Sequence, residues 1–558
     1  MMTEHTPENL KETQVQIATP FLPHIISLII MVIFDQLAWE RKFGLQFFLL
    51  VLMILLALFI MARVEKKHIP WRSYLLLAPI LLGATMTIFQ KASSTTFFNI
   101  VLTLLGLILL AIALRNGQWL GYRIREVAMG ILLLIESMIV DPIKILIENK
   151  RTQKKPPAGE KNRTWRRIRP FFIGLVIAIP LLLIFGALLA SADLIFREQL
   201  SSFFDLFKIE NLAELLFRTF YIITLGYFMT GAYVHTLVRS AKEKDITPDK
   251  PLVQPFLGHV EAFIVLGLVN LLFLSFIIIQ FRYFFAGQAN ISIEGFTYAE
   301  YARRGFFELI IVAVLSLGVF YLMSAFTKRS TRATRRTFSA LGILLMLQVG
   351  CMLVSAFQRL SLYEAAYGFT TLRAMTYIFM IWLGVLIIAV ALMEVFNQFK
   401  RLALVLLIIF FGFTLTLNLF NLDRFITQRN IAHAQAGNPL DASYLVHNLS
   451  VDSVPALFEA EQASETSPEL KEALTAILAC KLTLRDHSGR EGSWPEWHFS
   501  ESTADSLFEQ HRGRLENYPL SLKSESSIYE EGGQRFEDTY QYYYFEVGGE
   551  EIYCMPVD

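Results

Sequence analysis

The residues best suited to chemistry are carboxylates, arginines and tyrosines that gather at the ends of apolar segments. Glu300, Arg304 and Glu308 follow one another at intervals of four, so on a helix they share one face. A glutamate can act as a general base, and an arginine can hold a phosphate or carboxylate through two parallel hydrogen bonds. The candidate site residues are Asp193, Gln280, Arg282, Tyr298, Glu300, Arg303, Arg304, Glu308, Arg359, Tyr363, Glu364, Arg373, Asn421 and Asp423.

Two interpretations of this set stay open. In the functional one, the side chains form an outward-facing pocket for the phosphate or carboxylate of a lipid, a glycan or a small anion. In the plainer one, Tyr and Arg anchor helix ends at the head-group level, and pairs such as Glu300 with Arg304 hold loops in place. The spatial arrangement of these residues distinguishes the two.

Motifs of the common enzyme classes are absent from the sequence. It contains no G-x-x-x-x-G-K-[ST] loop, no G-x-G-x-x-G turn, no G-x-S-x-G elbow, no H-E-x-x-H pair and no C-x-x-C pair. This excludes ATP-driven transport within the chain and argues against serine-hydrolase and zinc chemistry. We therefore expect no metal and no cofactor. The missing motifs favour a protein that is not an enzyme, but a membrane transferase with scattered acids and arginines would leave no such motif, so both alternatives stay open.

The elements that must position these residues are apolar helices. The chain has 558 residues, of which 54% are hydrophobic and 18% charged, and it contains runs long enough to span a bilayer. This predicts a mainly α, polytopic membrane protein with about eleven spans, and twelve if 127–147 also crosses. The predicted spans are 21–38, 44–62, 71–89, 97–114, 170–190, 216–238, 258–281, 306–327, 337–357, 374–394 and 402–420.

The distribution of basic residues predicts the orientation. If 127–147 lies on the membrane surface and the N-terminus is cytoplasmic, 29 of the 40 Lys and Arg in 1–420 face the cytoplasm and 11 face outward. This arrangement is more asymmetric than one in which 127–147 spans. We therefore expect an interfacial helix and a basic cytoplasmic linker over 127–169, after a polar tail at 1–20 and within a membrane domain at 21–420.

Few ionisable residues fall inside the expected spans. Asp35 lies near the outer end of the first span, where an interfacial carboxylate is expected rather than a proton carrier. His235 and Glu394 lie near inner boundaries and are expected to be satisfied there.

An acidic C-terminal domain is expected at 421–558, outside the cytoplasm. This part has 10 Lys and Arg against 24 Asp and Glu, so the net charge of +1 is a cancellation between it and the basic membrane part. The patterns predict helices followed by a β-hairpin, in which 534–547 and 550–556 flank a Gly-Gly turn. The domain is thus expected to be a small α+β domain.

Two of the three cysteines, Cys480 and Cys554, fall in this domain. If the domain is external, a disulfide between them is permitted, and two unpaired thiols are the alternative. Cys351 lies inside an apolar segment and is expected to be a packing residue.

Several motifs resemble a known family of bacterial multi-pass membrane proteins, the 4153/4173 group of domains of unknown function. The resemblance covers about residues 170 to 512. It rests on 280–287, 297–309, 359–373, 421–423, 430–431, 440–441, 444–445, 449–457, Trp494, Trp497 and Ala504. It implies an integral protein of the bacterial cell membrane with a soluble C-terminal extension, and no established activity.

Three functions remain as hypotheses. The first is a non-enzymatic sensor, envelope or regulatory component, whose acidic domain meets a protein or envelope partner. The second is a transferase that modifies a lipid or glycan at the outer leaflet, and the third is a transporter or channel. The bilayer is the expected environment in every case, and no basic folded module for nucleic acid is visible.

Overall fold

The computed structural model describes residues 18–41, 44–152, 212–241, 255–285, 306–487, 494–531 and 534–556, and a few single residues between 178 and 196. The chain is a helical membrane protein. Among the described residues, nine helices are long and apolar enough to cross a bilayer, and α1 (Leu22–Ala38) is a shorter apolar helix. These helices correspond to ten of the predicted spans, and the remaining one, 170–190, lies almost entirely outside the described residues.

The chain divides into two compact units, and the first contains α1, α9 (Leu212–Val238) and parts of α2 (Leu45–Val64) and α6 (Ile124–Thr152). In this unit α9 runs very close to α6 at Gly231. A Cβ atom on Gly231 would lie 2.4 Å from the Cα atom of Met138, so glycine is needed for this approach.

Helix α6 covers the region expected to lie on the membrane surface. It has 29 residues and contains Pro142, and it is not among the nine helices that meet the criteria for crossing a bilayer. Its location at the surface stays a prediction.

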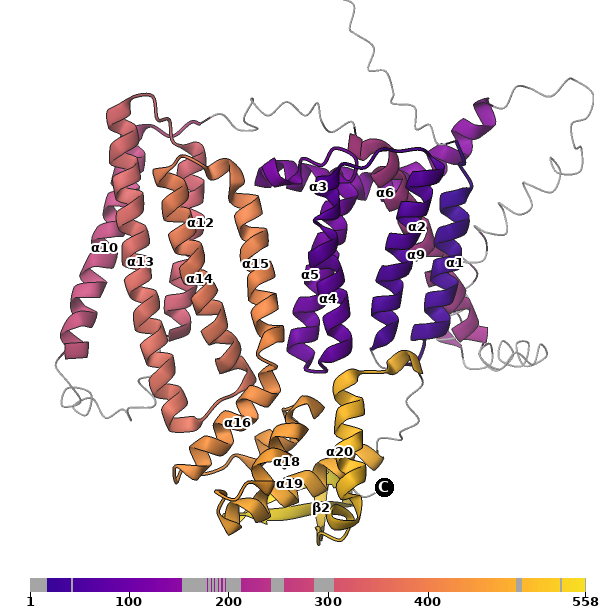
Figure 1. Ribbon diagram of the computed structural model, residues 1–558, viewed down its shortest axis with the longest axis vertical. Coiled ribbons are helices and arrows are strands. Elements are labelled where there is room, and N and C mark those ends of the chain that lie inside the picture. Colours follow the sequence, from indigo (N-terminus) through magenta and orange to yellow (C-terminus); the bar gives the residue numbers. More distant parts are fainter. Residues whose placement is uncertain are drawn as a thin grey trace, which may run out of the picture. The chain divides into compact units, whose positions relative to one another are not determined.

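The second unit contains most of the membrane helices. After the first part of α2 come α3 (Trp71–Tyr74), α4 (Leu77–Phe89), α5 (Ser93–Ala113) and the 3-10 turn η1 (Trp119–Gly121). The later helices run roughly side by side in Figure 1. They are α10 (His259–Phe285), α12 (Phe306–Phe326), α13 (Arg332–Tyr367), α14 (Thr371–Val395), the 3-10 turn η5 (Phe399–Arg401) and α15 (Leu402–Leu419).

Packing in this unit depends on large side chains opposite small ones. A buried cluster joins α10, α12, α13 and α14, with Phe320 fully buried at its centre. Phe320 fits because Gly342 leaves room for its ring, and a Cβ atom there would overlap it. At α14 and α15, Gly412 makes room for the Trp382 indole in the same way. Close packing of this kind replaces the hydrophobic driving force that is missing between helices in lipid.

The C-terminal part consists of helices followed by a small sheet. It begins with α16 (Leu422–Gln435), α17 (Ala442–His447), η6 (Val451–Ser453) and α18 (Val454–Gln462), and continues with α19 (Pro468–His487), η7 (Trp494–Glu496) and α20 (Phe499–Glu516). The strands are β1 (Ser521–Glu531), β2 (Gln534–Val547) and β3 (Glu550–Pro556). They form an antiparallel sheet in the order β1-β2-β3. The predicted hairpin is confirmed, with Gly548 and Gly549 at positive φ in its turn.

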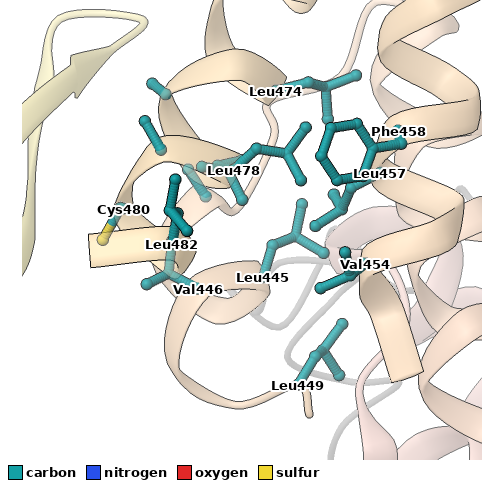
Figure 2. Close-up of a cluster of buried hydrophobic side chains, with 14 of the residues drawn as sticks. Leu445, Val446, Leu449, Val454, Leu457, Phe458, Leu474, Leu478, Cys480 and Leu482 are labelled. Carbon is teal, nitrogen blue, oxygen red and sulfur yellow. The ribbon is translucent and has the colours of Figure 1, made fainter. Parts of the chain in front are cut away.

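A hydrophobic core holds these elements together. Figure 2 shows part of this core, where Leu445, Leu457 and Leu478 approach one another from α17, α18 and α19. Cys480 and Cys554 form a disulfide that joins α19 to β3. The core also includes Ala374 of α14, so it continues into the end of a membrane helix.

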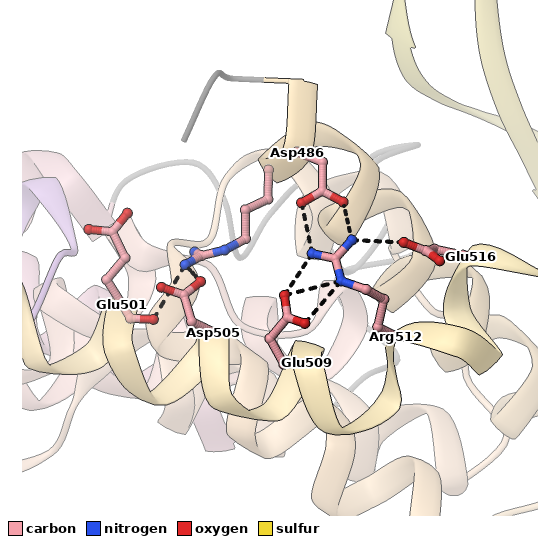
Figure 3. A network of polar contacts seen from close by, with 7 residues as sticks. Asp486, Glu501, Asp505, Glu509, Arg512 and Glu516 are labelled. Carbon is pink, nitrogen blue, oxygen red and sulfur yellow. Dashed lines mark hydrogen bonds and ion pairs between the residues drawn. The ribbon is translucent and has the colours of Figure 1, made fainter. Parts of the chain in front are cut away.

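An ionic network covers the face where α19 and α20 meet (Figure 3). The Arg512 guanidinium lies 2.8 Å from Asp486 of α19 and 2.8 Å from both Glu509 and Glu516 of its own helix. Hydrogen bonding to Arg512 lowers the pKa of Glu509. Because the network combines three carboxylates on one planar cation, it fixes the two helices better than a single exposed pair would.

Candidate functional site

The turn between α4 and α5 is bound by a carboxylate of the C-terminal part. Asp452 Oδ2 accepts hydrogen bonds from the backbone N–H groups of Lys91 at 3.0 Å and Ala92 at 3.1 Å. Lys91 Nζ in turn lies 2.7 Å from Glu501 of α20. Asp452 is held in place because Ser450 caps the η6 turn and donates to the same carboxylate oxygen at 3.1 Å.

A pair of buried amides ties the same hairpin to the last membrane helix. Asn99 of α5 and Asn418 of α15 exchange hydrogen bonds of 3.0 and 2.7 Å. Gln90 Nε2 donates to the Asn418 carbonyl at 2.5 Å. The α4–α5 hairpin is therefore joined both to α15 and to the C-terminal part that follows it.

Asp423 and Lys481 lie buried where α16 meets the rest of the C-terminal part. Asp423 Oδ2 accepts a hydrogen bond from Ser450 N at 2.8 Å. Lys481 Nζ donates to the carbonyl oxygens of Val446 at 3.1 Å and Leu449 at 2.9 Å. Burial raises the pKa of Asp423 and lowers the pKa of Lys481 to about 8, and the Asp423 charge partly opposes the latter effect.

Asn421 begins α16 and positions Asp423. It has φ of 38°, in the left-handed region that Asn tolerates, and its side chain accepts a hydrogen bond from Arg424 N at 3.3 Å. This cap turns the chain sharply after α15. Asn421 and Asp423 therefore help to join the membrane helices to the C-terminal part.

A second polar group surrounds the turn between α13 and α14. The Arg373 guanidinium lies 4.1 Å from the Tyr363 ring centroid and donates to the Tyr367 carbonyl at 3.1 Å. Glu364 lies on the same helical end, half-buried, and its carboxylate makes no hydrogen bond or ion pair with another described residue.

The charges nearest to Glu364 come from the turn and from α16. Arg373, Arg429 and His433 all act on its carboxylate electrostatically. Helix α16 is held against this turn because the Asn430 amide pairs with both backbone groups of Phe369, at 2.7 and 2.9 Å. Arg429 and His433 were missed by the sequence reasoning, because nothing in the sequence indicates that α16 folds back onto this turn.

The remaining sequence-predicted residues fall partly on described elements and partly outside the described residues. Asp193 is exposed and accepts a hydrogen bond from Phe196 N at 3.1 Å, and Gln280 Oε1 accepts one from Ser355 Oγ at 2.6 Å. Glu308 is exposed in the first turn of α12, and Arg359 is buried in α13. Arg282 belongs to α10, but its side chain and the whole of Tyr298, Glu300, Arg303 and Arg304 lie outside the described residues.

A carboxylate with several partners is present in the first unit. Asp35 of α1 is buried, and Arg218 of α9 donates to both of its oxygens, at 2.5 and 3.1 Å. Tyr221 donates to Asp35, and Glu214 accepts from Arg218 at 3.1 Å. Asp35 therefore serves as a helix-to-helix anchor, whose partners were not predicted because they come from a distant segment.

Glu394 lies at the end of the second unit that is remote from the C-terminal domain. Its Oε1 atom accepts hydrogen bonds from Arg329 Nη1 at 3.0 Å and Ser339 Oγ at 2.6 Å. These bonds join the α12–α13 loop and α13 itself to the end of α14. In the first unit, His235 Nδ1 lies 2.9 Å from Ser137 Oγ. Within the described part of the chain, no three His, Cys, Asp or Glu side chains are grouped so that they could hold a metal ion.

Comparison with known proteins identifies the family. The model of a domain of unknown function, DUF4153, matches residues 76–460, which is more than half of the chain. No curated protein and no solved structure matches the chain. The match begins at α4 and ends in α18, so it includes both Lys91 and its partner Asp452. The resemblance seen in the sequence is thereby confirmed, and the chain belongs to the DUF4153 family.

Proposed function

We propose that this membrane protein is a non-enzymatic sensor, envelope or regulatory component of a bacterial cell membrane. In this proposal, the acidic C-terminal domain lies outside the cytoplasm and passes the effect of a partner to the membrane helices. The observation that carries the proposal is the binding of the α4–α5 turn by Asp452, together with the core that the domain shares with α14.

The arrangement of contacts supports such a role. The C-terminal part contacts two connections between membrane helices, α4 to α5 and α13 to α14, and it follows directly from the end of α15. Thr371, at the start of α14, donates its backbone N–H to the Tyr444 hydroxyl at 2.6 Å. A partner that moved this domain would therefore move several membrane helices together, as a two-state signalling element requires.

The charges at the two ends of the second unit support the proposed orientation. The loops 327–336 and 396–401, at the end remote from the C-terminal domain, contain seven Lys and Arg and no Asp or Glu. Basic loops of this kind collect on the cytoplasmic side. The acidic domain would then face outward, where a Cys480–Cys554 disulfide persists.

One observation favours the transferase as the second candidate. Glu364 is a carboxylate with no direct partner among the described residues, and it lies near Arg373 and Arg429. A base beside two guanidinium groups could act on a phosphate-linked substrate at the outer leaflet.

Complementation of a full deletion in the source organism distinguishes these functions. The variants are the intact chain, a chain ending at Phe420, and full-length Glu364→Gln, each compared at equal amounts in the membrane. We expect the intact chain and Glu364→Gln to restore the deletion phenotype and the truncated chain to fail. Restoration by the truncated chain would refute the proposal, and failure of folded Glu364→Gln alone would instead favour the transferase.

A further inference from the structure

An apolar cavity of about 650 Å³ lies among the membrane helices of the second unit. Its walls come from α5, α12, α14 and α15, and η1 and the first turns of α6 line one end. Phe98 and Phe413 line it toward the C-terminal domain, while Trp119 and Ala403 line it at the other end. The cavity therefore extends along much of the length of α5 and α15.

The lining has no polar group to offer a ligand. Both indoles in the wall are already bonded: Trp382 Nε1 donates to Thr416 Oγ1 at 3.1 Å, and Trp119 Nε1 donates to the Arg72 carbonyl at 2.9 Å. Water needs polar partners, so it gains little here. An empty apolar space of this size would forfeit dispersion contacts around its whole wall. A hydrocarbon chain is the occupant that a bilayer supplies.

Positive charge lies at one end of the cavity. The turn η5 packs against η1, and its residues Lys400 and Arg401 immediately precede the lining residues Ala403 and Leu404. The Lys400 and Arg401 side chains are exposed and make no ion pair with another described residue. Two cations beside the mouth of an apolar cavity suit the phosphate of an anionic lipid head group.

We propose that this cavity is a binding site for one acyl chain of an anionic phospholipid, whose phosphate lies against Lys400 and Arg401. The site goes beyond the proposed function, since it concerns the end of the helices remote from the C-terminal domain. The lipid would complete the packing of α5, α12, α14 and α15, which the side chains leave unfilled.

Quenching of tryptophan fluorescence by brominated acyl chains tests this site in the intact protein. Two vesicle preparations contain the same mixture of phosphatidylcholine and a minor fraction of phosphatidylglycerol. In one preparation the phosphatidylglycerol carries brominated acyl chains. In the other, an equal amount of the phosphatidylcholine carries them instead. We expect stronger quenching by the anionic lipid, and we expect Trp119→Phe/Trp382→Phe to abolish the excess.

Charge variants test the head-group contact. Lys400→Gln/Arg401→Gln should reduce the preference for the anionic lipid by roughly 25-fold, to near parity, because each basic residue near the surface contributes about fivefold. Lys400→Glu/Arg401→Glu reverses both charges, and it should reduce the preference further because the anionic head group is then repelled. The matched control Arg335→Glu/Arg336→Glu changes the same charge at the same end of the helices, away from the cavity, and should keep the preference.

Three results would overturn the proposal. The first is equal quenching by the two brominated lipids in the unaltered protein. The second is stronger quenching by the anionic lipid that persists in both Lys400/Arg401 variants. The third is stronger quenching by the anionic lipid that persists when Trp119 and Trp382 are replaced. The last result would place a bound anionic lipid elsewhere on the protein.

Discussion

At the residue scale, Asp452 has a role that depends on backbone far away in the sequence. Its carboxylate accepts from two N–H groups that precede α5, and such groups have no partner within their own helix. A negative charge at this helix start is also favoured by the helix dipole. The residue therefore stabilises the hairpin and fixes the C-terminal part to it through one side chain.

Replacing Asp452 by alanine should weaken this junction. Loss of two charge-assisted hydrogen bonds is expected to cost about 2–4 kcal/mol, and Asp452→Asn should cost less because one acceptor oxygen remains. Hydrogen exchange of the amides at 91–96 measures the effect, and it should accelerate in Asp452→Ala. The control is Glu459→Gln, which breaks the exposed pair with Arg424 and should leave this exchange unchanged. Unchanged exchange in Asp452→Ala would contradict the assigned contact.

Lys481 should make stability depend on pH in the alkaline range. Burial lowers its pKa to about 8 from 10.5, so the unfolded chain binds this proton more tightly than the folded protein does. The free energy of unfolding should therefore rise as the pH increases from about 8 to 10.5. This rise should be about 3 kcal/mol larger in the unaltered protein than in Lys481→Met. Denaturant unfolding in detergent measures this difference. Lys471→Met, on the same helix, should follow the unaltered protein, and parallel curves for Lys481→Met would refute the assignment.

At the scale of elements, some parts of the structure could be predicted from local pattern and others could not. The β2–β3 hairpin was predicted because Gly548 and Gly549 form a turn signal between an aromatic-rich run and a second, shorter run. Strand β1 was not, because its Ser- and Glu-rich sequence has little intrinsic preference for a strand, and pairing with β2 compensates for this.

The candidate site shows the same division. Tyr363, Glu364 and Arg373 were predicted together because they flank one turn. The charges of Arg429 and His433, which act on Glu364, come from α16. Lys91 and Asp452 are in contact although 361 positions separate them in the sequence. Contacts of this kind depend on how helices pack, which residue spacing in one sequence does not specify.

The disulfide should stabilise the C-terminal part by joining α19 to β3. Its loss in Cys480→Ser/Cys554→Ser is expected to lower the stability of this part by about 2–4 kcal/mol, since the closed loop is long. Limited proteolysis of the membrane-embedded protein measures this change. Cys351→Ser removes the free thiol of α13 and should have no effect. Equal proteolysis of the double variant and the unaltered protein would show that the bond does not contribute.

At the scale of the whole molecule, the small net charge conceals an ordered distribution. The basic loops 327–336 and 396–401 lie at one end of the second unit, and the acidic C-terminal domain lies at the other. The proposed function, the disulfide and the proposed lipid site all require the same orientation. The C-terminal domain must face the oxidising side, and Lys400 and Arg401 must face the anionic cytoplasmic leaflet.

Cysteine labelling in intact cells tests this orientation most directly. Ser521→Cys places a thiol on exposed β1, and the matched Ser330→Cys places one in the basic loop at the opposite end, both in a Cys351→Ser background. A membrane-impermeant maleimide should label Ser521→Cys in intact cells and Ser330→Cys only after permeabilisation. The reverse pattern would place the acidic domain in the cytoplasm and contradict the account.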